Sequence, residues 1–232
     1  SSGTILPNSK DLKFNFEAIN VEEVTVRIIK IYEDNVLQFL QENNINSNNE
    51  YEIKRVGRRV AKETITLMSG KVHNSQKWKA FSVDIAKMIA TEPGAIYRIE
   101  LSFNKNQTLY NCTENSATTT TANDFEEEYD GGYDNLSAIE DEEEREELYW
   151  DNKLYNYKNY RYNWRERENP CDDSYYYEGR MIAQNLLASN LGIIAKKGTN
   201  NAYFFAVTNI LNTSVEAGAN VKLFNFQQKE IA

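Results

Sequence analysis

The sequence of 232 residues predicts an all-β protein: a seven-stranded antiparallel β-sandwich, then a connector, then a partial second β module. Three observations carry this prediction. Short runs that alternate with a period of two, or that are rich in β-branched residues, recur through the first hundred or so positions with almost no helix. The composition then turns acidic and tyrosine-rich. Three more strand-like runs, joined by turn-rich stretches, fill residues 189–232.

The first strands are expected within residues 11–32. Phe14, Phe16 and Ala18 alternate with polar residues there, and a run rich in β-branched residues follows. Residues 36–40, VLQFL, fit either one helical turn or a strand end, and the pattern leaves both open. Further strands are expected at 51–60, 63–68 and 78–83, and a helical turn is expected at 85–89.

The last strand of the sandwich is expected at residues 95–103, directly after the tight turn Glu92-Pro93-Gly94. Its residues alternate with a clean period of two. This pattern predicts a half-buried strand, because successive side chains point to opposite faces of a sheet. One face carries Ile96, Arg98, Glu100 and Ser102, and the other carries Tyr97, Ile99, Leu101 and Phe103.

Charge is concentrated in one segment. Residues 124–147 contain 13 Asp and Glu but only one basic residue, Arg145, so they carry −12 and the rest of the chain sums to +3 within the total of −9. Because the basic residues are dispersed and the strongest local field is negative, we expect no nucleic acid partner. We also expect neither a membrane-spanning segment nor a signal peptide in this chain.

A tyrosine-rich stretch follows, and residues 149–177 hold eight of the fifteen tyrosines. So many aromatic residues do not suit a solvated linker. We expect them to pack between the β modules with Arg and Lys stacked on them; the alternative is a surface that stacks on sugars or on a peptide. The possible interaction surface consists of Trp164, Tyr175, Tyr176 and Tyr177.

The two cysteines, Cys112 and Cys171, bracket the acidic segment. We predict that they form a disulfide, which would stabilise the fold by about 4 kcal/mol on the loop-entropy model. Two unrelated buried thiols in a cytosolic protein are the alternative. A zinc site is not expected, because the sequence has no C-x-x-C spacing and no Cys/His cluster.

Catalytic and metal chemistry find little support in the sequence. His73 is the only histidine, and neither a nucleophile nor an orienting acid stands near it in the sequence. Residues 126–137 have part of the carboxylate spacing of a calcium loop, but Ser137 occupies the last position, where such a loop requires glutamate. We therefore expect a chain that is not an enzyme and that has no catalytic residue, cofactor or metal.

Several phrases are similar to one protein family: FEAINVEEVTVRIIKIYEDNVLQFLQEN, YEIKRVGRRV, EPGAIYRIELSF, NWRERENPC, NLLASNLGIIAKKG, AVTNIL and GANVKLFNFQQKEI. The first three resemble the N-terminal macroglobulin domain of bacterial alpha-2-macroglobulin family proteins, and the last four resemble the connection into the next macroglobulin domain. The resemblance implies seven-stranded sandwiches, like those of fibronectin type III, that stack into a framework around a bait region. A proteinase cuts the bait, the framework collapses, and the proteinase is trapped.

The resemblance implies that this chain is a non-catalytic scaffold fragment of a broad-spectrum endopeptidase inhibitor. Its partners would be the other domains of the parent chain and, through the whole protein, target proteinases. The parent would be a lipoprotein of the bacterial cell envelope, facing the periplasm or the surface, with its lipid anchor outside this chain; that location suits a disulfide. Neither Cys112 nor Cys171 fits the family's C-x-E-Q thioester motif, so this chain would supply scaffold and not the covalent trap.

A surface adhesion or glycan-binding β-sandwich module of an envelope protein is the alternative function. If the chain is a fragment of an alpha-2-macroglobulin-like inhibitor, it divides into three parts. We expect a macroglobulin-like sandwich at 1–112, a connector at 113–180 and a truncated second macroglobulin-like domain at 181–232. The last part has expected strands at 191–196, 202–209 and 219–226. Three strands leave open edges, so we expect residues 203–207, YFFAV, to seek a partner, either the first domain or a second copy of the chain.

Overall fold

The computed structural model describes residues 5–6, 13–46, 53–68, 77–112, 163–172, 174–177, 181–200 and 202–232. Its strands are β1 (Ile5–Leu6), β2 (Lys13–Ala18), β3 (Glu23–Ile31), β4 (Gly57–Thr66), β5 (Lys79–Asp84), β6 (Ile96–Ser102), β7 (Met181–Ala188), β8 (Leu191–Lys197) and β9 (Tyr203–Asn209). Its α-helices are α1 (Val36–Glu42), α2 (Ile53–Val56), α3 (Ile85–Met88) and α5 (Ser174–Tyr177), and its 3-10 helices are η1 (Glu33–Asn35), η2 (Lys105–Gln107) and η5 (Trp164–Glu166).

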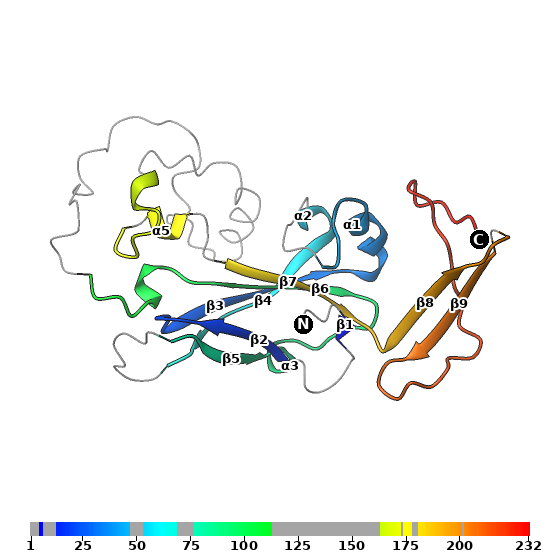
Figure 1. The fold of residues 1–232 in the computed structure, drawn as a ribbon, viewed down its shortest axis with the longest axis horizontal. Helices are drawn as coiled ribbons and strands as arrows, with labels where there is room; N and C mark the ends of the chain where they lie inside the picture. Colours follow the sequence, from blue (N-terminus) through cyan, green and yellow to red (C-terminus); the bar gives the residue numbers. More distant parts are fainter. Residues whose placement is uncertain are drawn as a thin grey trace.

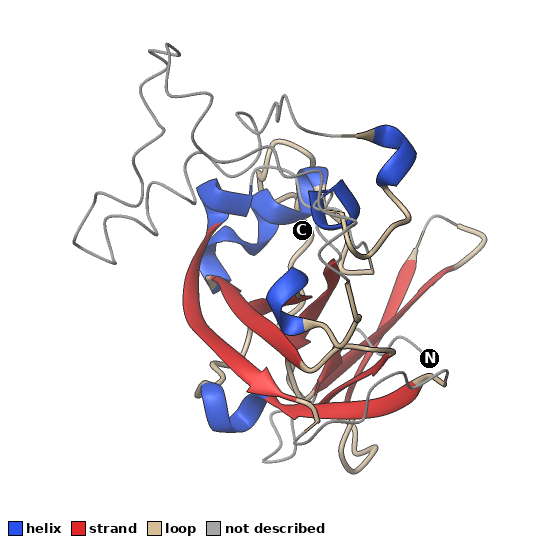
Figure 2. Ribbon diagram, turned by 90° about the vertical axis from the view of Figure 1, so that its left-hand side faces the viewer, coloured by secondary structure: helices blue, strands red, loops and turns tan. Residues whose placement is uncertain are grey.

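The strands confirm the predicted all-β fold class (Figure 1). A five-stranded sheet in the order β1-β7-β6-β3-β4 faces a two-stranded sheet of β2 and β5, and β8 and β9 form a separate hairpin. Every pairing among these strands is antiparallel except that of β1 with β7, which is parallel. Figure 2 shows that most of the short helices gather on one side of the strands.

The main core lies between the two sheets. Phe14 and Phe16 of β2 project from the small sheet, as their alternation predicts, and they pack with Val26 and Ile28 of β3 and Ile99 of β6. All five side chains are buried or nearly so. Removing a side chain of this size from water stabilises a fold by about 1.5–3 kcal/mol, so this cluster holds the small sheet on the large one.

A second cluster lies on the outer face of the five-stranded sheet. Phe39 of α1 and Ile53 and Val56 of α2 cover Ile29 and Ile96 there. The sequence left residues 36–40 open between a helical turn and a strand end, and the structure shows that they belong to helix α1.

The predicted strand at 51–60 is wrong in its first half. Ile53–Val56 form a helical turn, and β4 then runs unbroken from Gly57 to Thr66 instead of as two strands. Ile53 and Val56 stand three positions apart, the spacing that places both on one side of a helix. A Cβ at Gly57 would lie 2.8 Å from the carbonyl oxygen of Lys30, so glycine permits the close approach at this junction.

The expectation of a half-buried strand at 95–103 is also wrong. Strand β6 sits between β3 and β7, and its residues from Ile96 to Leu101 are buried on both faces. Arg98 and Glu100, on the outer face, are 1% and 0% exposed. The alternation correctly separated the two faces of the strand but could not show that both faces are covered.

The turn before β6 is fixed by polar contacts. Gly94 has a φ of 88°, a left-handed conformation that glycine adopts without strain. The backbone N–H of Glu92 donates to the hydroxyl oxygen of Tyr97 at 2.9 Å. The carboxylate of Glu92 binds the buried ammonium of Lys30, and this hydrogen bond raises the pKa of Lys30. The predicted tight turn is thus tied to the neighbouring strand β3.

Strand β7 changes the expected division of the chain. The sequence assigns residues from 181 onward to a second module, but β7 pairs with β6 along its length, from Ile96 opposite Leu187 to Ser102 opposite Met181. The first sandwich therefore takes β7, the neighbour of its central strand β6, from beyond the connector. A strand's partner is a non-local choice that the pattern of the strand itself does not encode.

The expected strand at 219–226 is absent from the described residues. Only an isolated bridge between Phe224 and Glu230 forms there. The backbone turns back on itself, with the N–H of Leu223 donating to the carbonyl of Ala232 and the N–H of Ile231 donating to the carbonyl of Leu223. These backbone groups of the segment are therefore paired within it, without a strand partner.

Candidate functional site

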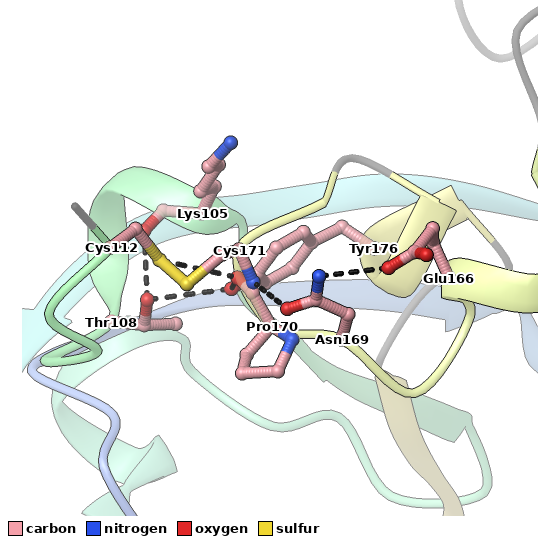
Figure 3. The surroundings of a disulfide bond; sticks show 8 residues. All are labelled: Lys105, Thr108, Cys112, Glu166, Asn169, Pro170, Cys171 and Tyr176. Carbon is pink, nitrogen blue, oxygen red and sulfur yellow. Dashed lines mark hydrogen bonds between the residues drawn. A yellow bond between two sulfur atoms is a disulfide. The ribbon is translucent and has the colours of Figure 1, made fainter. Parts of the chain in front are cut away.

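A disulfide joins Cys112 to Cys171, the pairing that the sequence predicts (Figure 3). Their Cα atoms lie 5.3 Å apart across a sequence separation of 59. The bond ties the segment 163–177 to the loop that follows β6. Both cysteines of the chain are used in it, so neither supplies a thiol for a thioester or a metal site.

The segment 163–177 is further shaped by its own polar side chains. The N–H of Asn163 donates to the hydroxyl oxygen of Ser174 at 2.8 Å. The N–H of Cys171 donates to Asn169 Oδ1 at 3.0 Å, and Asn169 Nδ2 donates to Glu166 Oε2 at 2.8 Å (Figure 3). Asn and Ser side chains commonly satisfy backbone groups of turns in this way. The disulfide and the hydrogen-bonded segment 163–177 together form one compact unit, which we call the disulfide knot.

Two tyrosines of the predicted interaction surface pack against the sandwich. Tyr176 meets Phe103 edge to face with ring centroids 6.2 Å apart, and its hydroxyl donates to the carbonyl of Pro170 at 2.7 Å. Tyr175 meets Tyr110 at 6.4 Å in a similar geometry. Both are half-buried, so most of their aromatic area serves packing. The side chain of Tyr177 lies outside the described residues.

Trp164 is the member of the predicted surface that faces solvent. It is 66% exposed, and the guanidinium carbon of Arg167 lies 3.8 Å from its ring centroid. A cation on one face of an indole is favourable, because the ring face is electronegative. An exposed tryptophan beside an ordered disulfide knot is a residue that can stack on a sugar ring or an apolar partner.

The hairpin of β8 and β9 forms the second candidate surface. Within the described residues these two strands pair as strands only with each other, and Figure 1 shows them beyond the end of the sandwich. Leu191, Ile193, Tyr203, Phe205 and Val207 share one face of the hairpin by register. Ile193 is 60% exposed and Tyr203 57% exposed. Exposed apolar groups of this extent mark contact surfaces.

A charged cluster on the outer face of the five-stranded sheet is the feature that sequence reasoning missed. Arg98 Nε donates to Glu100 Oε1 at 2.8 Å, and Arg98 Nη1 donates to Asn185 Oδ1 at 3.4 Å. Asn185 Nδ2 in turn donates to the carbonyl of Asn44 at 3.2 Å. The signal in the sequence was opposite charges two positions apart in an otherwise apolar strand, which also fits a solvated face.

The remaining predictions lie mostly outside the described residues. These include His73, the calcium-like run 126–137 and the acidic segment 124–147. Among the residues that the structure does describe, no group of three or more His, Cys, Asp or Glu side chains could hold a metal ion. In that same part of the chain, no helix has the length and apolar character needed to cross a membrane.

The fold and these surfaces define a β-sandwich protein whose recognisable features are contact surfaces. No protein-family model matches the chain, and no curated protein matches it. Two solved structures are similar to it, both of native alpha-2-macroglobulin from Escherichia coli. The one spanning domains NIE-MG1 has 10% sequence identity and a TM-score of 0.47, and the match covers 94% of this chain and 71% of that chain.

The structure spanning domains MG0-NIE-MG1 has 12% identity and a TM-score of 0.46, and the match covers 99% of this chain and 48% of that chain. The chain thus spans about half of this longer structure. Similarity at these values does not establish a common family or a common function.

Proposed function

We propose that this chain is a non-catalytic scaffold segment of an alpha-2-macroglobulin-like broad-spectrum proteinase inhibitor. The observation that carries the proposal is the hairpin β8–β9, which follows the sandwich after a two-residue link and presents apolar side chains to solvent. A framework of stacked β modules needs such surfaces, because modules join through apolar contact. The resemblance of the sequence phrases to macroglobulin domains supports the same function.

The cellular setting is part of this proposal. The parent protein would be a lipoprotein of the bacterial envelope, and its lipid anchor would lie outside this chain. The Cys112–Cys171 disulfide supports an oxidising compartment such as the periplasm, because disulfides persist there and are rare in the cytosol. Fractionation of cells that express the parent, followed by non-reducing peptide mapping, checks both points.

Proteinase trapping by the parent protein tests the inhibitor function. The parent would be mixed with a broad-specificity proteinase, and residual activity would be measured on a large protein substrate and on a small peptide. A trap lowers activity on the large substrate and preserves activity on the peptide, because only the peptide diffuses into the closed framework. Equal activity on both substrates, as with the heat-unfolded parent as control, would refute the inhibitor function.

We also propose that this chain self-associates through the apolar face of β8–β9. Ile193 and Ile194 offer a matched pair of positions, since they are 60% and 56% exposed but point to opposite faces of the hairpin. Ile193→Thr keeps a β-branched residue in the strand and removes apolar area from the contact face. We expect it to abolish association in light scattering with size exclusion, and we expect Ile194→Thr to leave association intact. A monomeric wild-type chain at all concentrations would contradict this.

A glycan-binding or adhesion module is the second candidate, and the exposed ring of Trp164 favours it. Trp78 provides a matched control, because it is also 66% exposed and lies elsewhere in the fold, directly before β5. Saturable binding on a glycan array that Trp164→Ala removes and Trp78→Ala preserves would favour this function. Binding that neither substitution changes would count against it.

A further inference from the structure

Strand β8 has one paired edge and one open edge. The N–H of Ile210 donates to the carbonyl of Asn190 at 2.8 Å, and the N–H of Gly198 donates to the carbonyl of Ala202 at 2.8 Å. Hydrogen-bonded pairs alternate with other pairs along an antiparallel ladder, so the even-numbered residues of β8 bond to β9. The backbone groups of its odd-numbered residues therefore point away from β9. Within the described residues, no strand or bridge besides β9 pairs with β8.

The outer edge of β9, by contrast, is partly covered by the chain itself. The N–H of Asn209 donates to the carbonyl of Ser214 at 2.8 Å, and the N–H of Glu216 donates to the carbonyl of Val207 at 3.0 Å. These bonds confirm that the odd-numbered residues of the hairpin direct their backbone groups outward. The part of the chain that the structure describes contains no equivalent segment paired along the outer edge of β8.

The open edge of β8 lacks the usual protection against strand addition. Proteins guard an edge with charged side chains, with proline or by keeping the strand short. Strand β8 is 7 residues long, and residues 191–195 contain neither a charge nor a proline. Ile193 and Ile194 are both more than half exposed, and the two lysines, Lys196 and Lys197, stand only at the end of the strand. Such an edge can accept a further strand.

A second copy of β8 fits this edge in one orientation. Parallel pairing in register would place each lysine beside the same lysine of the second copy, and like charges side by side on neighbouring strands are destabilising. Antiparallel pairing centred on Ile194 instead places Lys196 opposite Gly192 of the second copy. Lys197 then lies opposite Leu191. The two Lys196 residues are about 14 Å apart along the strands, which exceeds the Debye length of about 8 Å at physiological salt.

This pairing also joins the apolar faces of the two hairpins. Directly opposite residues lie on the same face of a sheet, so Ile193 lies beside Ala195 of the second copy. One hairpin alone is marginally stable, and three or more strands are needed for independent stability; the joined hairpins meet that need. We propose that two copies of the chain pair in this way, edge to edge through β8. The inference rests on the self-association proposed above and adds its geometry.

Amide hydrogen exchange of the full chain, measured by NMR, tests the edge pairing. The N–H of Leu191 donates to Ser189 Oγ at 3.0 Å, so the N–H groups of Ile193, Ala195 and Lys197 are the probes of the edge. They should exchange fast in dilute, monomeric samples. Where about nine-tenths of the chains are associated, they should exchange about tenfold more slowly, because only the free tenth remains open. The even-numbered residues of β8, which bond to β9, should change little and serve as the internal control.

The outcomes of the exchange experiment separate the proposals. Protection of the three probes already in the monomer would show that the chain covers its own edge, and would overturn the edge pairing. Association without protection would overturn the edge pairing and leave self-association through the apolar face in place. A chain that stays monomeric would overturn both. Proteinase trapping by the parent reports on the scaffold function separately, so that function can fail while the edge pairing stands.

A change of charge at one position tests the register. Leu191→Glu and Leu191→Lys remove the same apolar side chain, and within one chain residue 191 lies opposite the uncharged Asn209. In the proposed register residue 191 instead lies opposite Lys197 of the second copy, at both ends of the joined strands. We expect Leu191→Glu to associate about tenfold more tightly than Leu191→Lys in light scattering at low salt, and the difference to vanish in high salt. Adding Lys197→Glu to Leu191→Lys should restore association. Equal affinities of the two Leu191 variants at low salt would overturn the proposed pairing.

Discussion

Replacing Arg98 by methionine is expected to lower the free energy of unfolding by about 3–5 kcal/mol. The guanidinium of Arg98 contacts the carboxylate of Glu100, and the two side chains are 1% and 0% exposed. Methionine occupies much of the same volume but leaves Glu100 buried without that cation, so its desolvation is no longer compensated. Urea denaturation monitored by tryptophan fluorescence measures the loss from the midpoint and the slope.

Two further variants control for this result. In Arg98→Met/Glu100→Leu both charges are removed, and we expect most of the lost stability to return, because an apolar replacement of a buried pair is often neutral. Arg58→Met removes an exposed arginine from β4 and should change stability by no more than about 0.5 kcal/mol. If Arg98→Met is as mild as Arg58→Met, the buried pair of Arg98 and Glu100 does not contribute the stability expected here.

Replacing both cysteines by serine is expected to destabilise the protein by about 4 kcal/mol on the loop-entropy model, and by about 2–4 kcal/mol on the range typical of disulfides. The Cys112–Cys171 bond closes a loop of 59 positions, so its loss gives the unfolded chain many more conformations. The slope of a urea transition should also rise, because the unfolded variant exposes more surface. The same measurement as for Arg98 reports both changes.

Reductant provides the control for the disulfide. Wild-type protein treated with dithiothreitol should fall to the stability of the serine variant, and the serine variant should not respond to dithiothreitol. The packing of Tyr175 on Tyr110 and of Tyr176 on Phe103 should hold part of the knot in place without the bond. A serine variant with the wild-type midpoint would contradict the prediction. It would show that these contacts and the hydrogen bonds of the knot give the full stability without the disulfide.

Several features could be predicted from local sequence because their cause is local. The alternation of Phe14 and Phe16 places both on one face of a strand, and the structure buries both. The turn at Glu92-Pro93-Gly94 follows from the backbone preferences of proline and glycine. With only two cysteines in the chain, Cys112 had a single possible partner within the molecule. The apolar runs at 191–196 and 202–209 predicted strands for the same local reason, and the structure forms β8 and β9 there.

Other features depended on contacts between distant residues, and no local pattern could reveal them. Residues 53–56 became a helix because Ile53 and Val56 pack with Phe39 on the outer face of the sheet. Strand β7 joined the first sheet because β6 offered it an open edge across the connector.

The charged face of β6 shows most clearly what the local sequence cannot predict. A period of two separates the faces of a strand, and this much the sequence by itself determined for Arg98 and Glu100. Whether a face meets water depends on which elements fold over it, and only the tertiary structure decided that both residues are buried. The same holds for the hairpin: its apolar residues could be read from the sequence, but their exposure arises because the described residues leave that face uncovered.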